Sequence, residues 1–347
     1  MKRAKSKLSD QIKNHVFRDR SSNKTEYDGN IGTVISTGST LLDLAISGER
    51  VRGGGIPGGI MVEGFGPEGA GKTVLLCEIG GDIQRKGGQD IFLDPEARLN
   101  KRFAEMFGIN IGEAAYDMPD TVEKMFDCIK NWEPEPDDVV HGILADSLAA
   151  LTTEMEIEGS DKYGMRRAKE FSEGLRLRCR EIRQKNLLLV CSNQVRTDVN
   201  SGPYGPPDES PGGRAIKFYS SLRLRFHAPK KNKVKKTIHG KKVERTIGID
   251  ARVYVAKSTV GKPYREAIIP IIFDYGIDDI RANLQFIKDN KGSKVYTLGK
   301  EDLSNSMDKA IEMIEQDELE QKLKDEVINL WESIEAQFAS VRRPKRR

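Results

Sequence analysis

Along most of its length the chain alternates short apolar runs with longer segments of helical periodicity. Nearly continuous apolar runs, which are typical of buried strands, occur at 58–66, 89–95, 139–151 and 186–193. Helical periodicity is found between them, near 72–86, 99–107, 120–132 and 166–185. This alternation predicts an α/β fold with a mainly parallel, twisted sheet that helices cover on both faces.

The pattern changes on either side of this core. Three apolar segments at 220–227, 248–258 and 265–274 predict further strands joined by hairpins. From about residue 276 the chain is rich in charged helix formers and ends in the basic sequence RRPKRR. We therefore expect an N-terminal arm at 1–30, a core at 31–275 and a helical C-terminal region at 276–347.

The N-terminal arm is predicted to be a basic helix with a narrow apolar stripe. Leu8, Ile12 and Val16 recur at intervals of four residues, so they lie on one side of such a helix. Packing on its own domain and docking on a neighbouring subunit both fit this stripe.

Composition limits the classes of function. Hydrophobic residues make up 37% of the chain and charged residues 32%, but the formal net charge is only +4, so a nucleic-acid partner would need local clusters of basic residues. Apolar runs stay shorter than the roughly 18 residues of a membrane helix, and the N-terminus lacks the apolar stretch of a signal peptide. The four cysteines form no C-x-x-C pair. We expect a cytoplasmic protein without disulfides, zinc or membrane contact.

The most specific motif is GPEGAGKT at 66–73, which fits the phosphate-binding pattern G-x-x-x-x-G-K-[ST]. It follows a predicted strand and opens a predicted helix, so its backbone N–H groups and the positive end of the helix would face an anion. Lys72 would contact the β- and γ-phosphates, and the hydroxyl of Thr73 would bind Mg²⁺. The candidate nucleotide-binding residues are Gly66, Pro67, Glu68, Gly69, Ala70, Gly71, Lys72, Thr73 and Val74.

Two acids at the ends of predicted strands fit the same chemistry. Asp146 lies at a predicted strand end within the run at 139–151 and is the candidate for holding Mg²⁺ through water. An N-cap for the next segment is the alternative, and it is less favoured because the phosphate-binding turn requires an acidic partner. Asp94 and Glu96 follow the run at 89–95, and Glu96 is the better candidate for polarising a water molecule. Composition alone would allow both of these acids to be helix caps.

Taken together, these motifs resemble the RecA recombinases, and their bacterial and phage branch most of all. The resemblance rests on ISTGSTLLDLAISG (35–48), GPEGAGKT (66–73), DPEARL (94–99), LADSLAALTTEMEIEG (144–159), SNQVR (192–196) and PGGRAIKFYSSLRLR (211–225), in this order and spacing. It covers about residues 30–275. It implies a RecA-type P-loop ATPase that uses ATP and Mg²⁺, forms a helical filament on single-stranded DNA and exchanges strands with homologous double-stranded DNA.

The resemblance also implies roles for single residues around the nucleotide. Phe103 would stack on adenine, Gln194 would sense the γ-phosphate, and Lys257 would reach across a subunit interface to the neighbour's ATP. The family usually has a second lysine two positions after Lys257, where this chain has Thr259, and Lys262 follows three residues later. This departure bears on the strength of hydrolysis more than on nucleotide binding.

Two loops are expected to contact single-stranded DNA, and the resemblance supplies the positions. The first loop, near 158–170, is about two residues shorter than usual. The second, at 193–219, is rich in Gly, Pro, Ser and Asp and has no apolar period. A solvated helix face would also account for the basic residues among the candidates. The candidates are Tyr163, Gly164, Met165, Ser172, Arg176, Arg196, Val199, Gly212, Gly213 and Arg214.

Basic residues cluster a second time at 229–245, where eight Lys or Arg stand against one Glu. A solvated hairpin tip is one interpretation. A secondary DNA site for the incoming duplex or the displaced strand is the other, with Lys235, Lys236, Lys241 and Lys242 as candidates. The basic C-terminal tail departs from the acidic tail of many bacterial members, so an acidic brake on duplex access is not expected.

Three functions remain open from the sequence. The first is a DNA-dependent ATPase and strand-exchange recombinase. The second is a ring-forming helicase or ATPase built on the same core, and the third is an ATP-gated single-strand scaffold with weak hydrolysis, for which Thr259 is the argument. A filament or a closed ring would separate the first two, and ATP turnover with and without DNA would separate the first and third.

Overall fold

The fold is known from a computed structural model, which describes residues 31–112, 115–136, 138–157, 165–195 and 213–339. Residues from Thr33 onward form one compact unit, and the segment up to Gly32 is a separate one. The predicted arm at 1–30, the tip of the first loop and most of the second loop lie outside the described residues. No helix in the described ranges is both long and apolar enough to cross a membrane.

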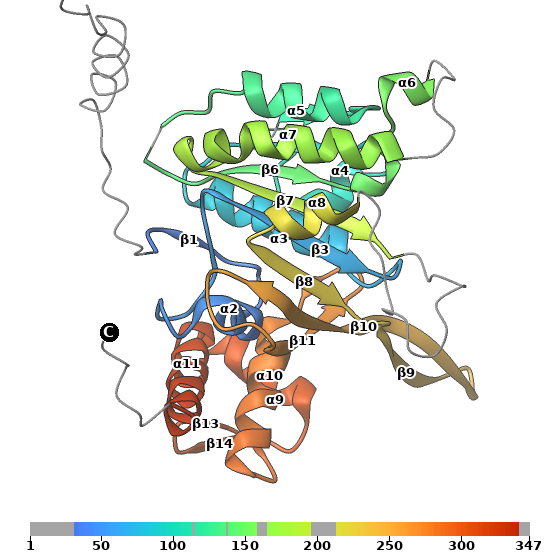
Figure 1. The fold of residues 1–347 in the computed structure, drawn as a ribbon. Coiled ribbons are helices and arrows are strands. Elements are labelled where there is room, and N and C mark those ends of the chain that lie inside the picture. Colours follow the sequence, from blue (N-terminus) through green and yellow to red (C-terminus); the bar gives the residue numbers. More distant parts are fainter. Residues whose placement is uncertain (1–30, 113–114, 137, 158–164, 196–212, 340–347) are drawn as a thin grey trace, which may run out of the picture. The chain divides into compact units, whose positions relative to one another are not determined.

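A ten-stranded sheet forms the centre of this unit (Figure 1). Its parallel half has the order β8-β3-β7-β6-β4-β5, which confirms the predicted α/β class with a mainly parallel sheet. The bounds of these strands are β3 Ile60–Gly66, β4 Asp90–Leu93, β5 Ala115–Asp117, β6 His141–Ala145, β7 Leu187–Gln194 and β8 Leu222–Phe226.

An antiparallel half continues the sheet beyond β8, in the order β10-β11-β12. Strand β10 is much longer than the sequence predicted, because its first half pairs with β9 in a separate hairpin. The bounds are β9 Lys230–Ile238, β10 Lys241–Ser258, β11 Glu266–Ile272 and β12 Gly276–Ile277.

Helices cover both faces of the parallel half. On one face α5 and α7 pack over the sheet, with Phe126, Phe171 and Leu175 buried against the apolar residues of β4, β6 and β7. Helix α3 packs against β3, β4, β6 and β7, and its Gly80 approaches Leu144, which alternates with the residues facing α5 and α7. The bounds are α3 Lys72–Arg85, α4 Lys101–Met106, α5 Val122–Asn131, α7 Met165–Gln184 and α8 Gly213–Tyr219.

The apolar run at 139–151 is the clearest difference between the predicted and observed core. Strand β6 ends at Ala145, and the remaining apolar residues form a short 3₁₀ turn, η1 (Leu148–Ala150), and helix α6 (Glu154–Ile157) follows. Asp146 and Ser147 leave the sheet at this point, and their side chains contact Thr73 of α3 and Glu96 after β4. The short strands β1 (Val34–Ile35), β2 (Ile56–Pro57) and β5 were not predicted.

The C-terminal region packs as a small helical layer around its own apolar core. Helices α9 (Asp279–Lys291), α10 (Met307–Gln316) and α11 (Glu320–Gln337) enclose Leu284, Ile314 and Val327, and α2 (Thr40–Ser47) adds Leu44 to the same cluster. The two-stranded sheet of β13 (Tyr296–Leu298) and β14 (Glu301–Ser304) was not predicted in this helical region.

Ion pairs hold the last helix to the core. Arg265, on the segment that enters β11, pairs with Glu335 of α11 and with Glu49, and its guanidinium lies 5.1 Å from the centre of the Trp331 ring. Arg52 pairs with Glu332 at 2.8 Å. The segment between β10 and β11 is therefore fixed by α11.

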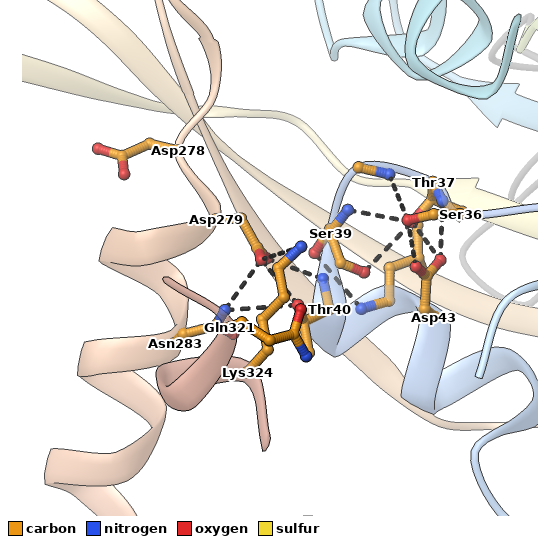
Figure 2. Close-up of polar contacts among 12 residues, drawn as sticks. Ser36, Thr37, Ser39, Thr40, Asp43, Asp278, Asp279, Asn283, Gln321 and Lys324 are labelled. Atoms are coloured by element: carbon orange, nitrogen blue, oxygen red, sulfur yellow. Dashed lines mark hydrogen bonds and ion pairs between the residues drawn. The ribbon is translucent and has the colours of Figure 1, made fainter. Parts of the chain in front are cut away.

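A buried polar network joins α2 to α9 (Figure 2). The carboxylate of Asp43 accepts hydrogen bonds from the Ser36 hydroxyl and from the backbone and hydroxyl of Thr37, at 2.5, 2.8 and 2.7 Å. That of Asp279 accepts from the backbone and hydroxyl of Thr40, at 2.8 and 2.7 Å. Burial raises the pKa of Asp43 to about 7, against the lowering effect of these donors, and it also raises the pKa of Asp279.

Stability should therefore depend on pH through Asp43. Its folded-state pKa is raised, so its contribution is complete below about pH 4 and is lost as the pH rises through about 7. We expect the free energy of unfolding to fall over this range, by up to about 1.4 kcal/mol per pH unit from this group. Urea unfolding of the wild type and of Asp43→Asn at several pH values measures the effect. For Asp43→Asn the free energy of unfolding should depend less on pH, whereas the exposed control Asp302→Asn should keep the wild-type dependence. The same pH dependence in all three proteins would refute the role of Asp43.

Candidate active site

The candidate site lies where the parallel strands end. Strands β3, β4, β6 and β7 all run in the same direction, so their carboxyl ends meet at one edge of the sheet, which is where open α/β sheets bind ligands. A cavity of about 470 Å³ opens at this edge. The residues predicted from separate parts of the sequence that line it are Glu68–Val74, Glu96, Phe103, Asp146 and Gln194.

The phosphate-binding motif forms the turn from β3 into α3. Gly71 has φ 95°, a left-handed conformation that glycine adopts without strain, and α3 begins at the next residue. Lys72 is 8% exposed, and its ammonium group donates to the carbonyl oxygens of Gly66 at 3.1 Å and Pro67 at 2.7 Å. Gly66 and Pro67 therefore support the lysine without lining the cavity.

Charge around Lys72 opposes the effect of its burial. Burial lowers the pKa of Lys72, while the negative charges of Asp146, Glu68 and Glu96 raise it. These carboxylates favour the charged form of Lys72 at the N-terminal end of α3. Lys72 and the positive end of the helix dipole therefore both attract an anion to this point.

Thr73 and Asp146, the two candidate ligands for Mg²⁺, lie together. The Thr73 hydroxyl donates to Asp146 at 2.5 Å, and the hydroxyl of Ser192 donates to the other carboxylate oxygen. Ser192 was not predicted from the sequence. The alternation along β7 could have indicated it, because Ser192 and Gln194 both line the cavity.

Glu96 is held at the same edge by its neighbours. Its carboxylate accepts a hydrogen bond from Ser147 at 3.0 Å and pairs with Arg98 at 2.7 Å. Ser147 and Arg98 both line the cavity and were not predicted. Asp94, the other acid after β4, is 2% exposed and accepts from the Leu99 backbone and the Tyr116 hydroxyl, so its role is to shape the turn.

The aromatic end of the cavity is built on α4. Asn100 caps this helix by accepting from the backbone of Phe103 at 3.3 Å. Phe103 and Phe107 meet edge to face with ring centres 4.5 Å apart. Phe273, half exposed after β11, lines the cavity as well and was not predicted. These rings offer a flat apolar surface of the kind that a purine base stacks on.

Lys257 is not among the residues that line this cavity. It lies near the end of β10, and its ammonium group donates to the carbonyl oxygens of Lys217 at 2.8 Å and Phe218 at 2.9 Å, at the last turn of α8. Thr259, the departure from the usual second lysine, is exposed, and its backbone donates to Ser221. The nearby Lys262 pairs with Glu49 at 2.9 Å.

The candidate DNA contacts are described only in part. Ser172 and Arg176 are exposed on α7, four residues apart and thus on one side of the helix, and Arg214 is exposed at the start of α8. Gly213 begins α8, and Met165 begins α7 although its side chain is not described. The candidates outside the described residues are Tyr163, Gly164, Arg196, Val199 and Gly212.

The basic run at 229–245 forms the hairpin of β9 and β10. Its tight turn, His239–Gly240, has positive φ at both positions, as a two-residue hairpin turn with the right twist requires. Lys235 and Lys242 lie on one face with Glu244, which pairs with Lys235 at 3.2 Å and with Lys233 at 2.9 Å. The second face carries Lys236, Lys241 and Arg245.

The donors present fit Mg²⁺ bound together with a nucleotide. Mg²⁺ prefers oxygen ligands and usually binds through one or two protein groups, substrate phosphates and water. Thr73 and Asp146 supply such oxygens beside the phosphate-binding turn. Over the described ranges, no group of three or more His, Cys, Asp and Glu side chains could hold a metal ion.

Comparison with known proteins decides the family. The model of the RecA N-terminal domain matches residues 13–278. The chain belongs to the RecA family. It is 31% identical over 305 residues to protein RecA of Delftia acidovorans, a match that covers 84% of this chain and 78% of the relative.

Further relatives agree with the family model. Protein RecA of Thermus thermophilus is 36% identical over 250 residues, covering 71% of this chain and 69% of its own. That of Thioalkalivibrio sulfidiphilus is 34% identical over 245 residues, covering 70% and 67%. The resemblance predicted from the motifs is thus confirmed, and the RecA family places the chain among recombinases of DNA recombination and repair. The ring-forming helicase and the weakly hydrolysing scaffold are not favoured.

Proposed function

We propose that this RecA-family chain binds and hydrolyses ATP with Mg²⁺, assembles as a helical filament on single-stranded DNA and exchanges strands with a homologous duplex. One observation carries the proposal. The cavity brings the phosphate-binding turn, Asp146, Glu96 and Gln194 to one edge of the sheet, and the strand that carries Gln194 leads directly into the predicted DNA-binding loop.

Each part of the cavity has a task in hydrolysis. Lys72 would bind the β- and γ-phosphates, and Thr73 and Asp146 would hold Mg²⁺, which adds positive charge there. Glu96, oriented by Ser147 and Arg98, would accept a proton from the attacking water. The water oxygen then bonds to the γ-phosphorus, and ADP leaves with the electrons of the broken bond. Phe103 and Phe273 would stack on the base.

Hydrolysis would be linked to DNA through Gln194. This side chain lines the cavity at the start of the second loop, so a change in its contact with the γ-phosphate would alter how that loop begins. The candidate contacts on α7 and at the start of α8 would bind phosphates, which gives affinity without sequence preference. A recombinase needs this, because base pairing reads the sequence.

Strand exchange tests the proposal as a whole. Circular single-stranded DNA and a homologous linear duplex should give joint molecules with the wild type and ATP, and none with Lys72→Ala, because the phosphates lose their cation. Glu96→Gln should bind ATP as the wild type does and lower kcat about 10²–10⁴-fold, since only the proton acceptor is removed. Absence of ATP-dependent joint molecules from the wild type would overturn the proposed function.

A separate measurement tests the role of Lys257. If its ammonium group stabilises the neighbour's transferring phosphoryl group, Lys257→Ala should form filaments but lose most DNA-stimulated ATP hydrolysis. Lys262→Ala is the matched control, because Lys262 is bound by Glu49 in the protomer. Full DNA-stimulated turnover by Lys257→Ala filaments would exclude this role, and an equal loss in both variants would assign it to the pair.

The hairpin is proposed as a secondary site for duplex DNA. Neutralising Lys235, Lys236, Lys241 and Lys242 should leave single-strand binding largely intact and flatten the salt dependence of duplex capture.

The two faces of the hairpin sharpen this test. Glu244 offsets the lysines of one face, so replacing Lys236 and Lys241 with Gln should weaken duplex capture more than the same change at Lys235 and Lys242. Filter binding over a series of salt concentrations measures both. Equal losses for single and double strands would argue against a separate site.

A further inference from the structure

A buried ion pair lies behind the active site, on the other face of the sheet. Glu63, in the middle of β3, is 0% exposed, and the Nε of Arg223 on β8 donates to its carboxylate at 2.5 Å. The guanidinium of Arg223 lies 4.2 Å from the centre of the Phe65 ring. A carboxylate inside an apolar strand is costly to bury unless it is paired, so its presence in this core calls for an explanation.

The same carboxylate holds the end of β7. The side-chain amide of Asn193 donates to the second oxygen of Glu63 at 3.1 Å. Asn193 stands between Ser192 and Gln194, which both line the cavity, and successive side chains of a strand point to opposite faces. Glu63 therefore fixes the stretch of β7 that presents Ser192 to Asp146 and Gln194 to the nucleotide.

Arg223 continues the row toward the edge of the parallel half. In the strand register Glu63 is opposite Arg223, and Arg223 is opposite Lys257 on β10. Burial and the positive charge of Arg223 lower the pKa of Lys257, while the charge of Glu63 raises it. Lys257 in turn holds the last carbonyl groups of α8.

These contacts meet at the two ends of one loop. Strand β7 ends at Gln194 and α8 begins at Gly213, so these two elements border the predicted second loop. The row made of Asn193, Glu63, Arg223 and Lys257 crosses β7, β3, β8 and β10, so it joins the nucleotide end of the loop to the end held at α8.

We propose that Glu63 is a positioning residue that couples the nucleotide cavity to the DNA-binding loop, by holding Asn193 on one side and Arg223, next to Lys257, on the other. The inference rests on the proposed function, since it gives the route by which ATP changes the grip on single-stranded DNA. Glu63 touches neither ligand and acts through Gln194 and Lys257.

Two variants separate coupling from stability. Glu63→Gln removes the charge and leaves the buried guanidinium of Arg223 unpaired, which destabilises the fold. The double variant Glu63→Gln with Arg223→Met removes both charges, and replacing a buried ion pair by neutral groups usually restores stability. A residue that only stabilises the fold would regain all function in the double variant, whereas a positioning residue would regain stability alone.

The experiment compares affinities of the full-length protein. Three quantities are measured for each variant. The first is the affinity for a fluorescent ATP analogue without DNA, and the second is the affinity for labelled oligo(dT) with a slowly hydrolysed ATP analogue or with ADP. The third is the free energy of unfolding in urea. We expect the double variant to unfold like the wild type and to bind nucleotide nearly as well, while the ratio of oligo(dT) affinities with the ATP analogue and ADP falls about tenfold. Glu266→Gln, which breaks the exposed pair with Arg252, should keep the wild-type ratio.

The outcomes are distinct. If the ratio of oligo(dT) affinities stays at the wild-type value in Glu63→Gln, or in the double variant with its restored stability, the role of Glu63 is overturned. A wild type whose oligo(dT) affinity does not respond to the ATP analogue would instead overturn the proposed function. Loss of nucleotide binding in the double variant would assign Glu63 to the shape of the cavity and would also refute the coupling.

Discussion

The parallel pairing of β3 with β7, and of β7 with β6, is the constraint on which the rest of the structure depends. Because these strands share a direction and are covered on both faces, polar side chains are concentrated at their carboxyl ends, where the backbone leaves the sheet. The phosphate-binding turn follows β3, Asp146 follows β6, and Gln194 is the last residue of β7. Glu96 lies just after β4, which pairs with β6 in the same direction. Glu68 and Gln194, which are 126 positions apart in the sequence, thus line one cavity.

Hydroxyl groups orient the carboxylates that the strand ends bring together. Thr73 and Ser192 hold the two oxygens of Asp146, and Ser147 holds Glu96. Each carboxylate therefore has a fixed orientation, which a proton acceptor and a metal ligand both require. Asn100 does the same for the aromatic end of the cavity by capping α4.

Much of this was predictable, for physical reasons that differ from one feature to the next. The buried strands have runs of apolar residues, and the phosphate-binding turn has a spacing that only its geometry explains. Strand β5 is three residues long and none of them is buried, so it has no alternation of apolar and polar residues to detect. Strand β9 consists largely of lysines, so it lacks the apolar residues from which a strand is predicted. Ser147 was missed because a single serine after a strand carries no periodic signal, whereas Ser192 could have been found from its alternation with Gln194. Glu63 was missed because its partners come from strands distant in sequence.

The hydrogen bonds of Lys257 have a thermodynamic consequence for assembly. Its ammonium group donates two of its three N–H groups to the last turn of α8, so in the proposed role a phosphate from another subunit could accept the third directly and would compete with those carbonyl oxygens for the other two. A ligand that rearranges α8 would therefore make it easier for the phosphate to bind Lys257. Because coupling between two binding sites is reciprocal, phosphate binding at Lys257 would favour binding of that ligand by the same factor. DNA would promote contact between protomers by the same factor by which contact between protomers promotes DNA binding.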